Sequence, residues 1–263
     1  MNHDRVLAQA LVTAKRAALA GGKVLRQRYK RIKVVADKAK DIQDFVTEAD
    51  WESEKVILSQ IRRRFPRHGV FAEESGKQGN LKSGYLWLVD PLCGTANFVN
   101  QLDLFVISIA LAYQGQPMMG VIYHPLSKTL FSAITGQAAR ANGHTIQVSK
   151  TRKLDRSVVA VTFGKTQKDR QSWAKPISRL VTKAYKIREF GSTPFSCSLV
   201  ADGRIDAFMG RPEPWDVVSG IVIVEEAGGK VTDWQGRPWS LESDSLLASN
   251  GKNHRQFINL LSH

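Results

Sequence analysis

The stretch YLWLVDPLCGTANFVNQ, residues 85–101, carries most of the information about this fold. An apolar run typical of a buried strand ends at Asp90, a turn follows, and small residues from Gly94 onward open an expected helix. Pro91 fixes the backbone of the turn, Gly94 permits close approach of another group, and free N–H groups near Thr95 suit an anion. The turn could therefore hold a phosphate, although a plain strand-to-helix turn with a helix cap explains it equally well.

Size and composition are those of an ordinary globular protein. The chain has 263 residues, of which 43% are hydrophobic and 24% charged, so we expect one or two domains. Its apolar runs are too short to span a membrane, and residues 1–19 lack the apolar core of a signal peptide. Two cysteines, Cys93 and Cys197, give no disulfide framework, which favours a cytoplasmic location.

The chain is strongly basic, with a formal net charge of +14. This excess attracts anions, which include phosphorylated metabolites and nucleic acid. The basic residues cluster at Arg26–Lys33, Arg62–Arg67 and Lys150–Arg156, where a solvated surface is the plainer interpretation. Because no zinc-finger spacing or RNA-recognition motif accompanies them, nucleic-acid binding rests on charge alone.

The first half combines helices and strands. Helical spacing of apolar residues predicts helices over 4–28 and 48–64, the second with Thr47 as N-cap and Asp50 in an acidic capping box. Strands are expected at 69–72, 86–89, 105–113, 118–124, 130–134 and 145–148, and Asn142-Gly143 indicates a hairpin before the last of them.

The second half alternates between strands and helices. Strands are expected at 157–163, 187–190, 205–209, 230–233 and 245–249, and helices at 172–184, 193–201, 215–227 and 255–261. The overall class is therefore α/β (α+β), with an N-terminal α+β domain over 1–148 and a βαβ-like C-terminal domain over 149–263. We expect the two to pack closely, because no low-complexity linker separates them.

Carboxylates stand at the ends of apolar segments in four places. These are Asp50, Glu73-Glu74, Asp90 and Asp216. Bare carboxylates are costly to bury, and divalent cations such as Mg²⁺ neutralise them through oxygen ligands. Each acid alone is more simply a cap or a surface charge, so their joint placement carries the argument.

These motifs closely resemble those of the inositol monophosphatase family. They are, in chain order, Val46–Asp50, Glu73–Ser75, Asp90–Phe98, Trp215–Asp216 and Glu226–Gly229. The resemblance implies a layered αβαβα fold, often dimeric. It also implies hydrolysis of a small phosphorylated metabolite with Mg²⁺, or alternatively Mn²⁺, as cofactor.

The resemblance also implies roles for individual residues. Glu73, Asp90 and Asp216 would be side-chain metal ligands, and Leu92 would bind metal through its carbonyl oxygen. Asp50 would lie near the metals through water. Glu73 and Thr95 would orient the attacking water, while the substrate's phosphate would contact Gly94, Thr95 and the Asp216 region.

Cys93 is the departure from the family, which has an aspartate metal ligand at this position. A thiol is mostly neutral at pH 7 and is a soft ligand, better suited to Zn²⁺ than to Mg²⁺. Three accounts follow. The enzyme works with fewer or weaker metals, which is the leading hypothesis; or it is a degenerate phosphatase that binds rather than turns over; or the thiolate recruits a softer metal or was introduced by design.

A cysteine-phosphatase mechanism is disfavoured. That chemistry needs an arginine after the thiol in a phosphate-binding loop, and Gly94–Phe98 has none. The neighbouring carboxylates should also raise the pKa of the Cys93 thiol.

The substrate need not be inositol phosphate. Inositol-binding members usually carry a glutamate where this chain has Met209, and Gly191–Pro194 departs from their small-residue segment. Histidinol phosphate, a sugar phosphate or a nucleotide remain alternatives. Arg188 and Arg211 could bind an anionic substrate, although plain surface positions explain both. The competing function is a binding protein associated with RNA or a transcription complex.

Overall fold

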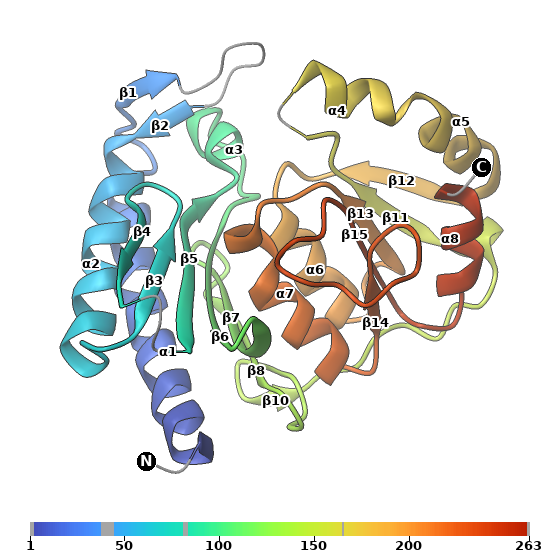
Figure 1. Cartoon of the computed structure of the whole chain (residues 1–263). Helices are drawn as coiled ribbons and strands as arrows, with labels where there is room; N and C mark the ends of the chain where they lie inside the picture. Colours follow the sequence, from blue (N-terminus) through green and yellow to red (C-terminus); the bar gives the residue numbers. More distant parts are fainter. Residues whose placement is uncertain (1–2, 38–44, 81–83, 165, 262–263) are drawn as a thin grey trace.

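Helices and sheets alternate in five layers in the computed structural model of the chain, which describes residues 3–37, 45–80, 84–164 and 166–261 (Figure 1). The first layer holds α1 (His3–Arg28) and α2 (Glu48–Arg64), which cover the larger sheet. Behind that sheet lie α6 (Thr193–Ala201) and α7 (Pro214–Glu226), and the smaller sheet follows. The last layer contains α4 (Gln167–Ser172), α5 (Ala174–Lys183) and α8 (His254–Leu261). The expected layered αβαβα fold is confirmed.

The larger sheet has eight strands within the described residues, in the order β10-β9-β8-β7-β6-β5-β3-β4. Its pairs are antiparallel except β3 with β5. The strands are β3 (Gly69–Ala72), β4 (Gly76–Gly79), β5 (Tyr85–Cys93), β6 (Val106–Tyr113), β7 (Gln116–His124), β8 (Thr129–Ile134), β9 (Arg140–Ala141) and β10 (His144–Thr145). A separate antiparallel ribbon pairs β1 (Val34–Asp37) with β2 (Phe45–Thr47).

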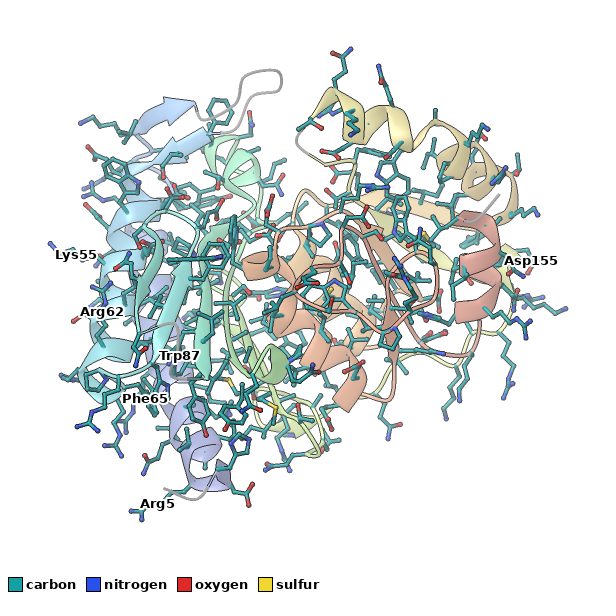
Figure 2. The ribbon with its side chains drawn as sticks, in the orientation of Figure 1. Arg5, Lys55, Arg62, Phe65, Trp87 and Asp155 are labelled. Carbon is teal, nitrogen blue, oxygen red and sulfur yellow. The ribbon has the colours of Figure 1, made fainter. Side chains whose placement is uncertain are left out.

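Both faces of the larger sheet are buried. Ile107 and Ile109 of β6 belong to the core under α1 and α2, whereas Val106 and Ala110 belong to the core that includes α6 and α7. The alternation follows from the two-residue period of a strand. On the first of these faces Trp87 of β5 contacts Phe65, with ring centroids 5.4 Å apart (Figure 2).

The smaller sheet is parallel in one part and antiparallel in the other. Its order in the described chain is β12-β11-β13-β15-β14. The strands are β11 (Val158–Val161), β12 (Lys186–Glu189), β13 (Ala207–Gly210), β14 (Lys230–Thr232) and β15 (Leu246–Ser249), preceded by a 3₁₀ helix, η2 (Leu154–Arg156). The βαβ-like expectation holds for β12-β11-β13 and for β14, which follows β13 through the crossover helix α7 and runs in the same direction. It fails for β15, which pairs antiparallel with both β13 and β14, because a loop rather than a crossover helix joins it to β14.

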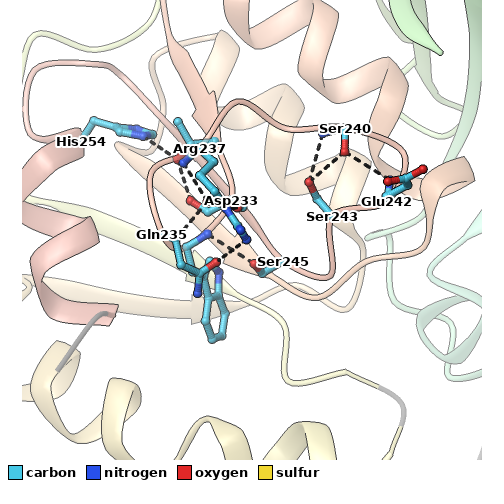
Figure 3. Close-up of polar contacts among 10 residues, drawn as sticks. Asp233, Gln235, Arg237, Ser240, Glu242, Ser243, Ser245 and His254 are labelled. Atoms are coloured by element: carbon cyan, nitrogen blue, oxygen red, sulfur yellow. Dashed lines mark hydrogen bonds and ion pairs between the residues drawn. The ribbon is translucent and has the colours of Figure 1, made fainter. Parts of the chain in front are cut away.

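That loop is held by its own polar groups (Figure 3). Asp233 accepts hydrogen bonds from the backbone N–H groups of Gln235 and Arg237, and its second oxygen accepts from the Arg237 guanidinium at 2.5 Å. His254 closes the other side by bonding Thr232 and Ser249. The conformation of the loop is therefore fixed largely by hydrogen bonds within it.

Helix ends follow the local sequence. α2 begins at a capping box in which Thr47 and Asp50 bond each other's backbone, as expected. α7 ends where Gly228 adopts φ +86°, a left-handed conformation that favours glycine. Asn142 and Gly143 both have positive φ and form the expected hairpin turn between β9 and β10. In the described chain, no helix is long and apolar enough to cross a membrane.

Three expected elements had boundaries that were wrong by more than two residues. The expected helix over 172–184 is two helices, because Thr166 and Asp169 form a capping box that starts α4 earlier, and Pro176 has no N–H to continue the ladder past Trp173. The expected strand at 145–148 stops at Thr145, because the N–H of Val148 bonds the carbonyl of Ala227 instead.

The third error concerns the strand expected to end at Asp90. β5 continues to Cys93, which pairs with Val106 of β6, and the register shifts between Asp90 and Cys93. This irregularity accommodates Pro91, which cannot donate to a strand ladder. The acidic segment is therefore held by the sheet rather than by a free turn.

Candidate active site

Most of the acidic motifs meet at one cavity of about 320 Å³. It lies where the end of β5, the short helix α3 (Thr95–Val99) and the starts of α6 and α7 converge. Seven of the eight residues singled out from the sequence line it, namely Glu73, Asp90, Leu92, Cys93, Gly94, Thr95 and Asp216. Segments up to 143 residues apart in the chain, from Glu73 to Asp216, thus contribute to one site.

Asp90 is the most buried acid in this cavity. It is 1% exposed, and its Oδ1 accepts a hydrogen bond from the backbone N–H of Leu92 at 2.9 Å. Its Oδ2 is buried and has no hydrogen-bond partner within the described structure. Burial raises the pKa of Asp90 well above its ordinary value, and the negative charges of Glu73 and Asp216 raise it further. A bound cation would neutralise this concentration of negative charge.

Cys93 lies among these carboxylates. Carboxylate oxygens of Asp90 and Asp216 and the Sγ of Cys93 all lie within 4.8 Å of one another. Burial raises the pKa of the Cys93 thiol well above its ordinary value, and the charges of Asp90 and Asp216 add to the effect, which agrees with the expected direction. Without a cation the thiol is therefore neutral and a poor nucleophile.

Asp50 lies behind the cavity wall rather than in it. Its Oδ2 accepts hydrogen bonds from the backbone N–H and the hydroxyl of Thr47, and its Oδ1 lies 3.3 Å from the Thr95 hydroxyl. That hydroxyl also lies 3.0 Å from the Leu92 carbonyl oxygen. Burial raises the pKa of Asp50 to about 6, against the lowering effect of the Thr47 hydrogen bonds. Thr95 thus connects a buried carboxyl group to the cavity.

Gly94 is required at the turn into α3. Its φ of +97° is left-handed, and a Cβ there would lie 2.8 Å from the Leu104 carbonyl oxygen. Asn97 then donates to the Leu104 carbonyl at 2.8 Å, and ties α3 to the second half of the chain by donating to the Phe190 carbonyl at 2.7 Å. The turn is therefore fixed from both sides of the cavity.

Asp216 is positioned by the first turn of α7. Pro214 begins this helix, and the N–H of Asp216 bonds the carbonyl of Glu213. The helix is held against the sheet by the Ser219 hydroxyl, 2.7 Å from that of Ser108 on β6. The Ser108 hydroxyl also donates to the Trp215 carbonyl. The packing of α7 on the sheet therefore sets the position of Asp216.

The cavity also contains residues that sequence reasoning missed. Arg170, Asp169, Ser192 and Glu213 line it. The capping-box spacing of Thr166 and Asp169 was the available signal for a helix there.

The two arginines considered from the sequence differ. Arg211 lines the cavity, stacked 4.9 Å from the centre of the Trp234 ring and bonded to Asp244 at 3.0 Å, while Arg188 is exposed and does not line it. Met209 is fully buried in the core of the smaller sheet, so it offers the cavity nothing in place of a glutamate.

The fold and this site define a class: layered α/β proteins with an acidic cavity lined by residues from both halves of the chain. The sequence profile of the inositol monophosphatase family matches residues 6–263, and the chain belongs to that family. It is 36% identical to an inositol-1-monophosphatase of Synechocystis sp. over 254 residues, which cover 96% of this chain and 88% of that protein. It is 35% identical to the Nus factor SuhB of Salmonella typhimurium over 242 residues, 91% of each chain.

A solved structure agrees with this assignment. The inositol monophosphatase of Anabaena (Nostoc) sp. superimposes with a TM-score of 0.87 at 38% identity and covers 97% of this chain and 96% of its own. The resemblance read from the motifs is thus confirmed, and family membership supports a phosphatase function.

Proposed function

We propose that the protein hydrolyses a small phosphomonoester in this cavity with the help of divalent cations, of which Mg²⁺ is the first expectation and Mn²⁺ the alternative. The observation that carries the proposal is the convergence of Glu73, Asp90 and Asp216 on one cavity beside the Gly94 turn. Acids so close together are stable as anions only when cations neutralise them.

The donor set fits such cations. Glu73, Asp90, Asp216 and the Leu92 carbonyl would hold them, because hard ions prefer oxygen ligands. The partnerless Oδ2 of Asp90 supports this assignment. Divalent cations at this position would offset charge on the phosphoryl group and make water a better nucleophile.

The protein's own groups would orient the reactants. Glu73 and the Thr95 hydroxyl, which line the cavity, would orient the attacking water, and Asp50, 3.3 Å from the Thr95 hydroxyl, would accept its proton through Thr95. The backbone N–H groups of Gly94 and Thr95 would hold the phosphate. Attack forms a new P–O bond, the ester P–O bond breaks, and the leaving alcohol takes a proton from solvent.

The cavity wall guides the choice of substrate. Arg170 and Arg211 line the part of the cavity contributed by the second half of the chain. At the position where inositol-binding relatives usually carry a glutamate, this chain has Met209, which is buried away from the cavity. A guanidinium pairs well with carboxylate or phosphate. A screen should therefore include phosphomonoesters whose alcohol bears a second anionic group, beside inositol and sugar phosphates.

The decisive comparison is Glu73→Gln against Glu74→Gln. Both changes remove one negative charge at adjacent positions, but Glu74 does not line the cavity and its carboxylate accepts from the Trp51 indole instead. Phosphate release in a metabolite panel with Mg²⁺, Mn²⁺ or Zn²⁺ should disappear in Glu73→Gln and persist in Glu74→Gln. Equal activity in both variants would refute the assignment of Glu73.

A second candidate function is binding of an anionic polymer such as RNA. A groove of about 390 Å³ between α1 and α2 is lined by Arg5, Arg16, Arg63 and Arg64, and Figure 2 shows Arg5, Lys55 and Arg62 projecting from the same helical layer. Relatives named Nus factor SuhB make this candidate worth testing.

RNA binding would be measured by fluorescence anisotropy at increasing salt. Arg63→Glu with Arg64→Glu should weaken it, and the log–log salt slope should shrink by about 1.4, at roughly 0.7 per lost phosphate contact on single strands. Lys175→Glu with Lys183→Glu, on α5 at the opposite side of the molecule, is the charge-matched control. Equal effects of the two pairs of substitutions would mean that RNA binding depends on the net charge of the protein and not on the groove between α1 and α2.

Three further expectations from the sequence remain proposals. The first is a division into domains at residue 148. The second is a homodimer, which light scattering of the purified protein would test. The third is a cytoplasmic location, which the two free cysteines support.

A further inference from the structure

Cys93 occupies the centre of an otherwise all-oxygen site. Its sulfur and carboxylate oxygens of Asp90 and Asp216 form a three-ligand group within 4.8 Å. Cys93 is 8% exposed, which leaves it at the cavity wall rather than deep in the core. The buried, partnerless Oδ2 of Asp90 is an independent sign that a cation completes this group.

Sulfur changes which cation the group prefers. Mg²⁺ binds oxygen in near-octahedral geometry and has little affinity for a thiolate. Zn²⁺ accepts sulfur and carboxylate oxygen together, and three protein ligands with one open position are typical of catalytic zinc sites. One sulfur with two carboxylates fits the second description.

The other cysteine shows what an inert thiol looks like in this fold. Cys197 is fully buried in α6, where it packs against Gly220 of α7, and it does not line the cavity. Cys93, in contrast, lines the cavity and has two carboxylates as neighbours. Simple packing accounts for Cys197 and leaves the surroundings of Cys93 unexplained.

We propose that Cys93, Asp90 and Asp216 bind a thiophilic divalent cation of the Zn²⁺ type through a direct sulfur–metal bond. As that bond forms, the thiol proton passes to solvent. The oxygen donors Glu73 and Leu92 remain suited to Mg²⁺, so the cavity would take two different metals. The proposal deepens the proposed function, because it concerns the same cavity, yet metal binding can be measured without turnover.

Co²⁺ is the probe, because it replaces Zn²⁺ and reports a thiolate ligand by a sulfur-to-cobalt charge-transfer absorption. Metal-free full-length protein would be titrated with Co²⁺ alone. The absorption should saturate at one Co²⁺ per chain, vanish when Zn²⁺ is added, and survive excess Mg²⁺.

Two variants localise the signal. Cys93→Ser, which keeps the size of the side chain, should lose the charge-transfer absorption and bind Zn²⁺ roughly 10–100-fold more weakly. Cys197→Ser should keep both properties. Circular dichroism would verify that both variants fold. A wild-type protein without the absorption, or a Cys93→Ser variant that retains it, would overturn the proposal.

Phosphate release from the same samples separates this inference from the proposed function. The absorption without turnover on any substrate would leave the thiolate site standing and remove the phosphatase assignment. Mg²⁺-dependent turnover without the absorption would leave the phosphatase assignment standing and remove the thiolate site.

Discussion

At the scale of single residues, position 93 decides how the site handles metal. A carboxylate there would add a negative charge and a hard oxygen to Asp90 and Asp216. Cys93→Asp should therefore raise Mg²⁺-dependent phosphate release. We expect roughly tenfold or more, since even outer-shell changes at metal sites alter affinity or activity by about 10–100-fold. The measurement is kcat/KM over a Mg²⁺ titration.

The response of the Cys93→Asp variant to Co²⁺ provides an internal check. Cys93→Asp should lose the sulfur-to-cobalt absorption while it gains Mg²⁺ dependence. Unchanged Mg²⁺-dependent turnover would mean that position 93 does not contact a metal in this chain.

Individual acids could be predicted from sequence because they belong to recognisable motifs, whereas their partners could not. Glu73 and Asp90 follow apolar runs, Asp216 precedes one, and all three line the cavity. Arg170 and Ser192 line it too, but neither belongs to a spacing pattern that points to a site. They reach the cavity only because the second half of the chain folds over the first, which is tertiary information.

At the scale of elements, the contact between α7 and β7 controls Asp216. A Cβ added to Gly120 would lie 2.3 Å from the carbonyl oxygen and 2.8 Å from the Cα of Ser219. Both are backbone atoms, so Gly120→Ala must push the helix away from the sheet. We expect a loss of about 1–3 kcal/mol in the free energy of unfolding, or about 2–4 °C in Tm per kcal/mol.

The displaced helix should also weaken metal binding. Gly22→Ala is the matched control. Gly22 belongs to α1, on the opposite face of the sheet, and a Cβ added there would lie 2.4 Å from the Tyr123 ring. Both variants should melt earlier in calorimetry, but only Gly120→Ala should bind Co²⁺ or Zn²⁺ more weakly. Equal metal affinity in the two variants would show that α7 does not set the site.

Elements with strong local signals were predictable, and those defined by pairing were not. α1 and α2 have helical apolar spacing, and α2 has its capping box. The short strands β1, β2 and β4 have no apolar alternation of their own and exist through their partners. The continuation of β5 to Cys93 likewise depends on Val106 of β6, which no local pattern around Pro91 reveals.

At the scale of the whole molecule, the order of layers followed from the motifs, while the sheet order did not. The antiparallel β15 and β14 depend on the loop from Asp233 to Ser245 folding back on itself. At the strand ends beside this loop, Thr232 of β14 and Ser249 of β15 hydrogen-bond His254 and so link the smaller sheet to α8. Because His254 is titratable, its hydrogen bonds make the free energy of unfolding depend on pH.

Two buried histidines should make the fold sensitive to acid. His124 is 9% exposed and bonds the Ser198 hydroxyl at 2.9 Å, and His254 bonds two hydroxyls near the smaller sheet. Burial lowers the pKa of each to about 4, and the positive charges of Arg204 and Lys230 add to the respective shifts. The folded state therefore keeps both rings neutral where the unfolded chain already binds protons.

The sign of the effect follows from this difference. The contribution of each neutral, buried histidine to the free energy of unfolding is fully present above pH 6.5. It is lost as pH falls from 6.5 toward 4, by about 3 kcal/mol for each histidine. Asp50 acts in the opposite direction, because a folded pKa raised to about 6 makes its burial less costly as pH falls over much the same range. The total pH profile therefore mixes both contributions, and a difference between variants is needed to separate them.

His124→Gln isolates one histidine, because the contribution of Asp50 cancels in the difference from the wild type. At pH 7 the variant should be less stable, since it loses the ring contacts with Phe131 and Phe195. This deficit should shrink by about 3 kcal/mol by pH 4, because the variant has no ring to protonate on unfolding. Urea denaturation at a series of pH values measures it, with the exposed His144→Gln as control. A deficit that stays constant from pH 7 to 4 would mean that His124 takes up its proton equally well in the folded protein.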